Sequence, residues 1–269
     1  MEVHHPHHAT HKKKWSEYTI EFVLLFAAVT LGFFAENIRE HQVEIHKTEK
    51  SLITLYRDIQ KDSILFSSSL TKRKKVDSLF EIISKYYGKG EIKKHLTESY
   101  TFLGQISNRT MPTINGMALD EVKNTGRLNF IEDDNLINAI QNYSHFIKVL
   151  ESRELREENF LNQFIDPIRF KYFEQSILYL LNYDNAFVRG DSIVIKPLKA
   201  LPATISLLEE KSFNESSFIN ITGGMNNVIK RSNELRIEPA QKQCHELLQL
   251  LRKYFEKRSF SLTAEEEQQ

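Results

Sequence analysis

The stretch FVLLFAAVTLGFFA, Phe22–Ala35, decides the architecture of this chain, because none of its side chains is charged or strongly polar. The basic block HKKKW (His11–Trp15) precedes it, and ENIREH (Glu36–His41) follows it. Extended to Tyr18–Asn37, the segment rises about 30 Å as a helix, which matches the thickness of a bilayer core. The pattern predicts a transmembrane anchor over residues 15–38.

The flanks of the apolar run suit two membrane interfaces. Glu21 and Glu36 lie near its ends, where long charged side chains reach the headgroups. Trp15 and Tyr18 stand where interfacial aromatic residues are common. A proton-relay role for Glu21 is the alternative to this interfacial position.

Two other interpretations of the run stay open. A basic start followed by an apolar run is also typical of a cleaved signal peptide. Cleavage after Ala35 would place the bulky Phe33 where such sites need a small residue. A buried core helix of a soluble protein is the second alternative, because apolar runs shorter than about 18 residues occur there.

Basic residues flank the run on both sides. Lys12–Lys14 form a basic block without acidic residues before the run, whereas Arg39, Lys47 and Lys50 follow it among glutamates. Loops rich in Lys and Arg stay in the cytoplasm, and acidic residues contribute little to this rule. The compact block favours a cytoplasmic N-terminus. We expect a single-pass protein of the bacterial inner membrane with its bulk in the periplasm.

The composition favours helices. The 269 residues include only 9 Gly and 6 Pro, the residues that punctuate strands and turns. Lys+Arg and Asp+Glu are both 36, so the formal net charge is zero and no nucleic-acid partner is expected. The single cysteine, Cys244, excludes an internal disulfide. We predict an all-α fold in which the anchor helix continues into a long-helix bundle over 39–258. Residues 1–14 and the acidic 259–269 are predicted to be disordered tails.

Apolar spacing places the expected elements. Leu52, Leu55 and Ile59 begin a helical pattern that reaches Tyr87 and ends at Gly88 and Gly90, with a break expected at Ser67–Ser69. Further helices are expected over 91–106, 117–124, 133–165, 168–182, from Ala203, and over 216–257 with an interruption at Glu238–Pro239. A small β-hairpin is expected over Ala186–Pro197, around Gly190–Asp191.

Two segments resemble a known family. They are AVTLGFFAENIREH (Ala28–His41) and ALDEVKNTGRLNFIEDDNLINAIQNY (Ala118–Tyr143). Both resemble an uncharacterised single-span membrane protein family of Bacteroidota. The positions that match its central pattern are Leu119, Gly126, Leu128, Ile131, Leu136, Ile140 and Tyr143. The resemblance implies an all-helical extramembrane domain on one anchor, and it carries over no catalytic residue.

One face of the anchor is a candidate packing face. Ala28 and Gly32 are four residues apart, and Glu21, Ala35 and Glu36 lie on the same side of a helix. Small residues at this spacing let two helices approach closely in lipid. The pattern predicts a homo-oligomer, although Gly and Ala are also common in membrane helices without that role.

The N-terminal tail contains a group of histidines: His4, His5, His7, His8 and His11. Imidazole binds zinc, nickel and copper, so this tail is a candidate metal-binding segment. A structural metal site needs fixed geometry, which a disordered tail lacks. We interpret the histidines as a solvated, weakly metal-binding tail.

The chain contains none of the G-x-S-x-G, H-E-x-x-H, Walker or G-x-G-x-x-G motifs. Ser69 and Lys72 match S-x-x-K without its companion motifs, and we assign them to a solvated helix face. We therefore expect no enzyme and no cofactor. The sequence favours an interaction or scaffolding module whose partners are the lipid bilayer, a second copy and an unknown envelope protein. The alternative is an envelope sensor with a ligand-binding bundle.

Overall fold

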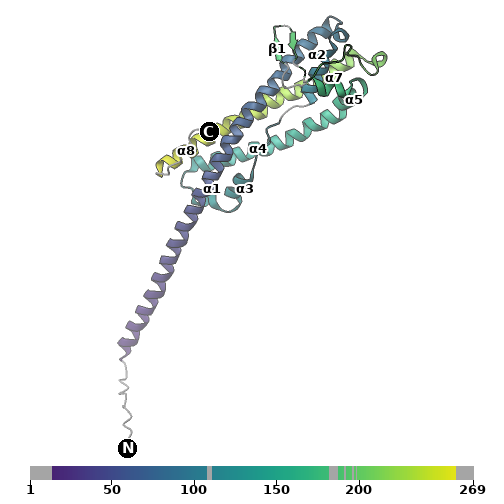
Figure 1. Ribbon diagram of the computed structural model, residues 1–269. Coiled ribbons are helices and arrows are strands. Elements are labelled where there is room, and N and C mark those ends of the chain that lie inside the picture. The colour runs from purple at the N-terminus through teal and green to yellow at the C-terminus, as the bar shows by residue number, and fades with distance from the viewer. Residues whose placement is uncertain are drawn as a thin grey trace, which may run out of the picture.

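The computed structural model describes residues 14–107, 111–181, 187–190, 192–195, 197 and 199–258. Its dominant element is α1, Trp15–Gly88, one helix of 74 residues that rises about 110 Å. In Figure 1 the first part of α1 forms a bare shaft, and the second part is one rod of a long head. We use shaft for residues 15–43 and head for residues 44–258.

The first helix continues without a break and ends where the sequence predicts. The break expected at Ser67–Ser69 is wrong, because Ser67 Oγ donates to the Ser63 carbonyl at 3.0 Å and so stays inside the helix. At the end, Glu91 N–H donates to the Tyr86 carbonyl, and Gly90 N–H donates to the Tyr87 carbonyl, both at 2.9 Å. Gly90 has φ +69°, as this cap geometry requires.

The rest of the chain confirms the all-α class. The helical elements are η1 (Ile92–His95), α2 (Leu96–Ser107), α3 (Met117–Asn124), η2 (Arg127–Phe130), α4 (Asp134–Phe160), α5 (Asp166–Tyr172), α6 (Gln175–Leu180), η5 (Glu210–Ser212), α7 (Glu215–Ser232) and α8 (Glu238–Lys257), with π turns η3 (Leu161–Ile165) and η6 (Asn233–Ile237). The expected hairpin is also present, as antiparallel strands β1 (Phe187–Arg189) and β2 (Ser192–Val194). Gly190, at φ +60°, makes the turn between them.

Two expected helices differ from the structure. The helix expected over 168–182 breaks at Phe173, whose backbone is extended. The Phe173 ring is fully buried against Tyr100, Phe213 and Phe218, so burial of the ring offsets the lost helical hydrogen bonds. The helix expected from Ala203 is also wrong, because only the short turn η5 forms there.

Proline does not interrupt the last helix, contrary to the prediction at Glu238–Pro239. The π turn η6 leads directly into α8, and η3 leads in the same way into α5 at Asp166–Pro167. A π turn is wider than an α turn, so the proline ring avoids the carbonyl four residues back. Residues 134–172 and 215–257 are therefore two continuous helical rods.

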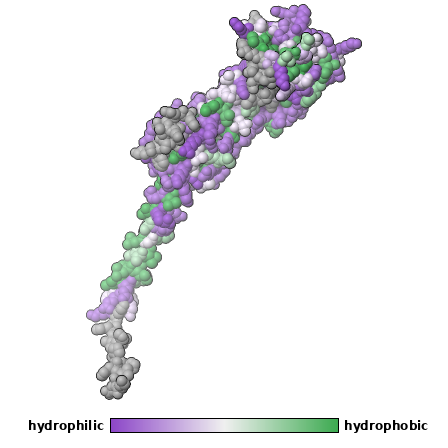
Figure 2. All heavy atoms as spheres, in the orientation of Figure 1, coloured by the Kyte–Doolittle hydropathy of each residue, from purple (hydrophilic) through white to green (hydrophobic). Residues whose placement is uncertain are grey.

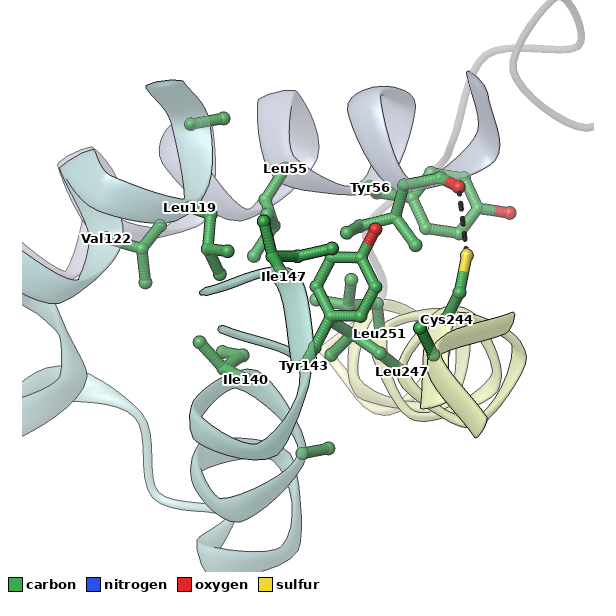
Figure 3. Packing of buried hydrophobic residues seen from close by; sticks show 14 of the residues in the cluster. Leu55, Tyr56, Leu119, Val122, Ile140, Tyr143, Ile147, Cys244, Leu247 and Leu251 are labelled. Atoms are coloured by element: carbon green, nitrogen blue, oxygen red, sulfur yellow. Dashed lines mark hydrogen bonds between the residues drawn. The ribbon is translucent and has the colours of Figure 1, made fainter. Parts of the chain in front are cut away.

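Three rods make the head. In Figure 1, α1 and α4–α5 run away from the shaft, α7–α8 returns, and α2 and the hairpin cover the far end. Two hydrophobic cores lie along the rods. The proximal core, near the shaft, joins α1, α3, α4 and α8 (Figure 3) and includes Leu52, Leu55, Leu119, Ile140, Leu247 and Leu251. The distal core joins α1, α2, η3, α5, α6 and α7 and includes Leu79, Ile83, Phe102, Ile165, Phe173 and Phe218.

Candidate functional site

The shaft exposes a continuous apolar surface. Figure 2 shows it as a hydrophobic band between hydrophilic ends. Phe22 is 67% exposed and Phe33 is 71% exposed. No residue of the most apolar 18-residue window of α1 is buried, so the alternative of a buried core helix is wrong. By length and composition this one helix, among the described residues, can cross a membrane; a signal sequence passes the same test.

The predicted packing face lies entirely on this bare part of α1. Glu21, Ala28, Gly32, Ala35 and Glu36 all project from the shaft. A Cβ added at Gly32 meets nothing within 4 Å, so the face is open. Association of two such faces stays a prediction. The candidate metal ligands His4, His5, His7, His8 and His11 lie outside the described residues.

The head begins close to the end of the apolar run. The His41 ring contacts the Phe130 ring of η2, with 5.6 Å between the ring centroids. His41 is six residues beyond Ala35, which is about 9 Å along a helix. The proximal end of the head therefore stands next to the apolar band.

A buried ion pair separates the two hydrophobic cores. Arg73 of α1 and Glu157 of α4 are both 0% exposed, and their closest atoms, Nη2 and Oε1, are 2.8 Å apart. Arg73 Nη1 also donates to Glu157 Oε2 at 3.1 Å, so the pair is bidentate. On the third rod, Asn233 of η6 accepts from Arg73 Nε at 2.5 Å. We call these three residues the polar layer.

Every donor of the buried guanidinium has a partner. Besides Glu157 and Asn233, Arg73 Nη1 donates to Met111 Sδ at 3.1 Å, and Nη2 donates to the Ile229 carbonyl at 3.4 Å. An arginine has five N–H donors, so none is left unsatisfied. The polar layer thus ties α1 to α4 and η6 at one level of the head.

A cavity of about 260 Å³ lies beside the polar layer, between α4 and the α7–η6 segment. Its lining residues are Arg153, Arg156, Gly224, Asn227, Val228, Arg231, Leu235 and Arg236. We call it the arginine cavity. None of its four arginines makes an ion pair with any residue that the structure describes. The nearby Glu157 carboxylate is already bound to Arg73.

Arg153 is the most constrained of the four. Its Nε is buried and has no hydrogen-bond partner within the described chain, while its Nη2 only reaches the Val228 carbonyl at 3.5 Å. Burial lowers the pKa of Arg153, and the charge of Arg156 lowers it further. An unmade buried hydrogen bond costs about 1–3 kcal/mol, so Arg153 carries a buried donor that no described residue satisfies.

A second set of buried polar side chains, Asp62, Tyr143 and Cys244, lies in the proximal core. Tyr143 OH donates to Asp62 Oδ2 at 2.7 Å, and Cys244 Sγ donates to the Ile59 carbonyl at 3.4 Å (Figure 3). Burial raises the pKa of Asp62 to about 6 and that of Cys244 to about 12. Cys244 is therefore a protonated core residue, and Asp62 is the group that titrates near neutral pH.

The polar layer and the arginine cavity were not predicted from the sequence. Arg73 stands in the run Lys72–Lys75, which resembles a solvated patch, but it continues the spacing of Phe66 and Leu70 toward Val76. This register position is the signal that could have placed it inside. The assignment of Ser69 to a solvated face is wrong, because Ser69 is 1% exposed.

Comparison with known proteins adds no assignment. No protein-family model, curated protein or solved structure matches the chain. Over the described ranges, no group of three or more His, Cys, Asp or Glu side chains is placed to hold a metal ion.

Proposed function

We propose that this chain is a membrane-anchored helical interaction module of the bacterial inner membrane. The bare apolar band of the shaft supports this proposal most directly, because soluble proteins rarely expose so much contiguous apolar surface. A bilayer would cover the band, and the proximal end of the head would then stand at the membrane surface.

The proposal includes a homo-oligomer with its bulk in the periplasm. The small residues Ala28 and Gly32 would let two shafts approach closely in lipid. The head would present its helical faces to an envelope protein at a distance set by the shaft. The resemblance to single-span proteins of Bacteroidota agrees with this arrangement.

Crosslinking and affinity capture in native membranes test the interaction role. We expect a crosslinked dimer together with one reproducible envelope partner. Gly32→Leu should weaken the dimer severalfold, whereas Thr30→Leu on the opposite side of the shaft should leave it unchanged. An unchanged dimer with Gly32→Leu would contradict the proposed packing face. A chain without any crosslinked partner would contradict the proposed interaction role.

The second candidate function is an envelope sensor, and the polar layer favours it. Arg73 belongs to the helix that continues into the anchor, and it is bonded to Glu157 and Asn233 of the two rods that enclose the arginine cavity. A ligand between these rods would act on the partners of Arg73. Hydrogen exchange of α1 with and without a bound ligand tests this coupling, which unchanged exchange around Arg73 would contradict.

A further inference from the structure

We propose that the arginine cavity binds a small soluble oxyanion with at least two negative charges. Its four arginines come from two rods: Arg153 and Arg156 from α4, Arg231 from α7 and Arg236 from η6. They gather around one cavity although no described carboxylate pairs with any of them. Like charges repel, so this arrangement is stabilised when an anion enters.

The geometry of Arg153 points to an oxygen ligand. Its Nε is buried without a partner, and its Nη2 makes only a 3.5 Å contact with the Val228 carbonyl. A guanidinium binds phosphate or carboxylate oxygens through two parallel N–H bonds. An anion in the cavity would lie between Arg153 and Arg156 on one wall and Arg231 and Arg236 on the facing wall.

The cavity is half open to solvent, and its small volume holds only a compact charged group. Its volume is about 260 Å³, which is below the range of drug-sized ligand sites. Val228 and Leu235 add an apolar wall. Gly224 lets α7 come close to α4, since a Cβ there would lie 3.1 Å from Phe160 Cζ. The ligand class is therefore a compact oxyanion such as a diphosphate or a small organic phosphate.

The distance of the arginine cavity from the apolar band favours a soluble ligand over a lipid headgroup. The polar layer at Arg73 is 38 residues beyond Ala35, about 55 Å along α1. Phosphate groups of the anchoring bilayer are out of reach at that height. Binding itself does not depend on either proposed function, whereas its effect on α1 rests on the sensor hypothesis.

Calorimetry on the full chain in nanodiscs of zwitterionic lipid tests the site, with inorganic pyrophosphate as the probe. We expect saturable binding with a dissociation constant below about 1 mM at low salt. Arg156→Gln and Arg231→Gln should each weaken it about tenfold or more. Lys148→Gln, an exposed cation on α4 outside the cavity, should change it less than about twofold.

Each outcome decides the proposal. Both cavity variants replace exposed side chains, so an unchanged melting temperature without pyrophosphate establishes that they fold. Absence of saturable binding, or equal affinity in the wild type and both cavity variants, would overturn the site. Loss of pyrophosphate binding in nanodiscs with anionic lipid would overturn the soluble source and assign the cavity to headgroups. Such results leave the membrane attachment and the crosslinking test untouched.

Discussion

Removing one partner of the polar layer should destabilise the head strongly. Glu157→Gln leaves the Arg73 guanidinium, 0% exposed, without the carboxylate that holds it at 2.8 Å. Breaking a buried ion pair on one side costs about 3–5 kcal/mol. For a domain of this size each kcal/mol lowers the melting temperature by about 2–4 °C. The expected decrease is thus about 6–20 °C.

A double-mutant cycle separates the contribution of the ion pair from the cost of burying each charge. Arg73→Met should cost a similar amount, because the buried Glu157 carboxylate loses the guanidinium that binds both of its oxygens. Arg73→Met combined with Glu157→Met removes both charges and should recover most of the loss. A remainder of about 1–3 kcal/mol is expected from Asn233 Oδ1, which loses its donor.

The assays are thermal unfolding and urea unfolding of the full chain in detergent micelles, both followed by circular dichroism. Matched controls are available one residue away: Glu158→Gln and Lys72→Met change exposed charges and should cost less than about 0.5 kcal/mol. A loss below about 1 kcal/mol in Glu157→Gln, or a double variant as unstable as the sum of its singles, would refute the reasoning.

Three more outcomes follow from local geometry. Gly223→Ala should destabilise the head by about 1–3 kcal/mol, because its Cβ would lie 2.8 Å from Phe80 Cζ. The control is Gly88→Ala, whose Cβ would meet nothing within 4 Å. Equal unfolding midpoints for the two variants would contradict the close approach of Gly223 to Phe80. Asp62→Asn should raise the free energy of unfolding at pH 7.5 by up to about 3 kcal/mol and flatten its pH dependence. The folded pKa of Asp62, about 6, is above the ordinary 3.8, so the stability from protonated Asp62 is complete below about pH 4 and is lost as pH rises through 6; a variant that keeps the wild-type slope would contradict this. Asp133→Ala should lower the free energy of unfolding by about 1 kcal/mol, since Asp133 Oδ1 accepts from the N–H groups of Asn135 and Leu136. Hydrogen exchange in the first turn of α4 should also become faster. Unchanged exchange there would contradict the cap.

Local signals explain the features that the sequence predicts well. The end of α1 depends on Gly90, the start of α4 depends on Asp133, and the bounds of α3 match the expected 117–124. In each case the residues that decide the structure are neighbours in the chain. The hairpin belongs to the same group, because Gly190, with φ +60°, lies in its turn.

Features that depend on contacts between distant segments were not predicted. Arg73 and Glu157 are 84 residues apart, and Asn233 is 160 residues from Arg73, so charge alone places Arg73 at the surface. An interruption was expected at Glu238–Pro239, because no local sequence pattern marks the π turn that precedes it. The arginine cavity exists only because α4 and the α7–η6 segment lie side by side.

Membrane attachment is tested most directly by the mass of the chain that stays with lipid after an alkaline wash. We predict that the sedimented vesicles retain the polypeptide at its full 31.6 kDa. A washed-out chain, or a product shortened by the residues up to Ala35, would contradict an anchor in the bilayer.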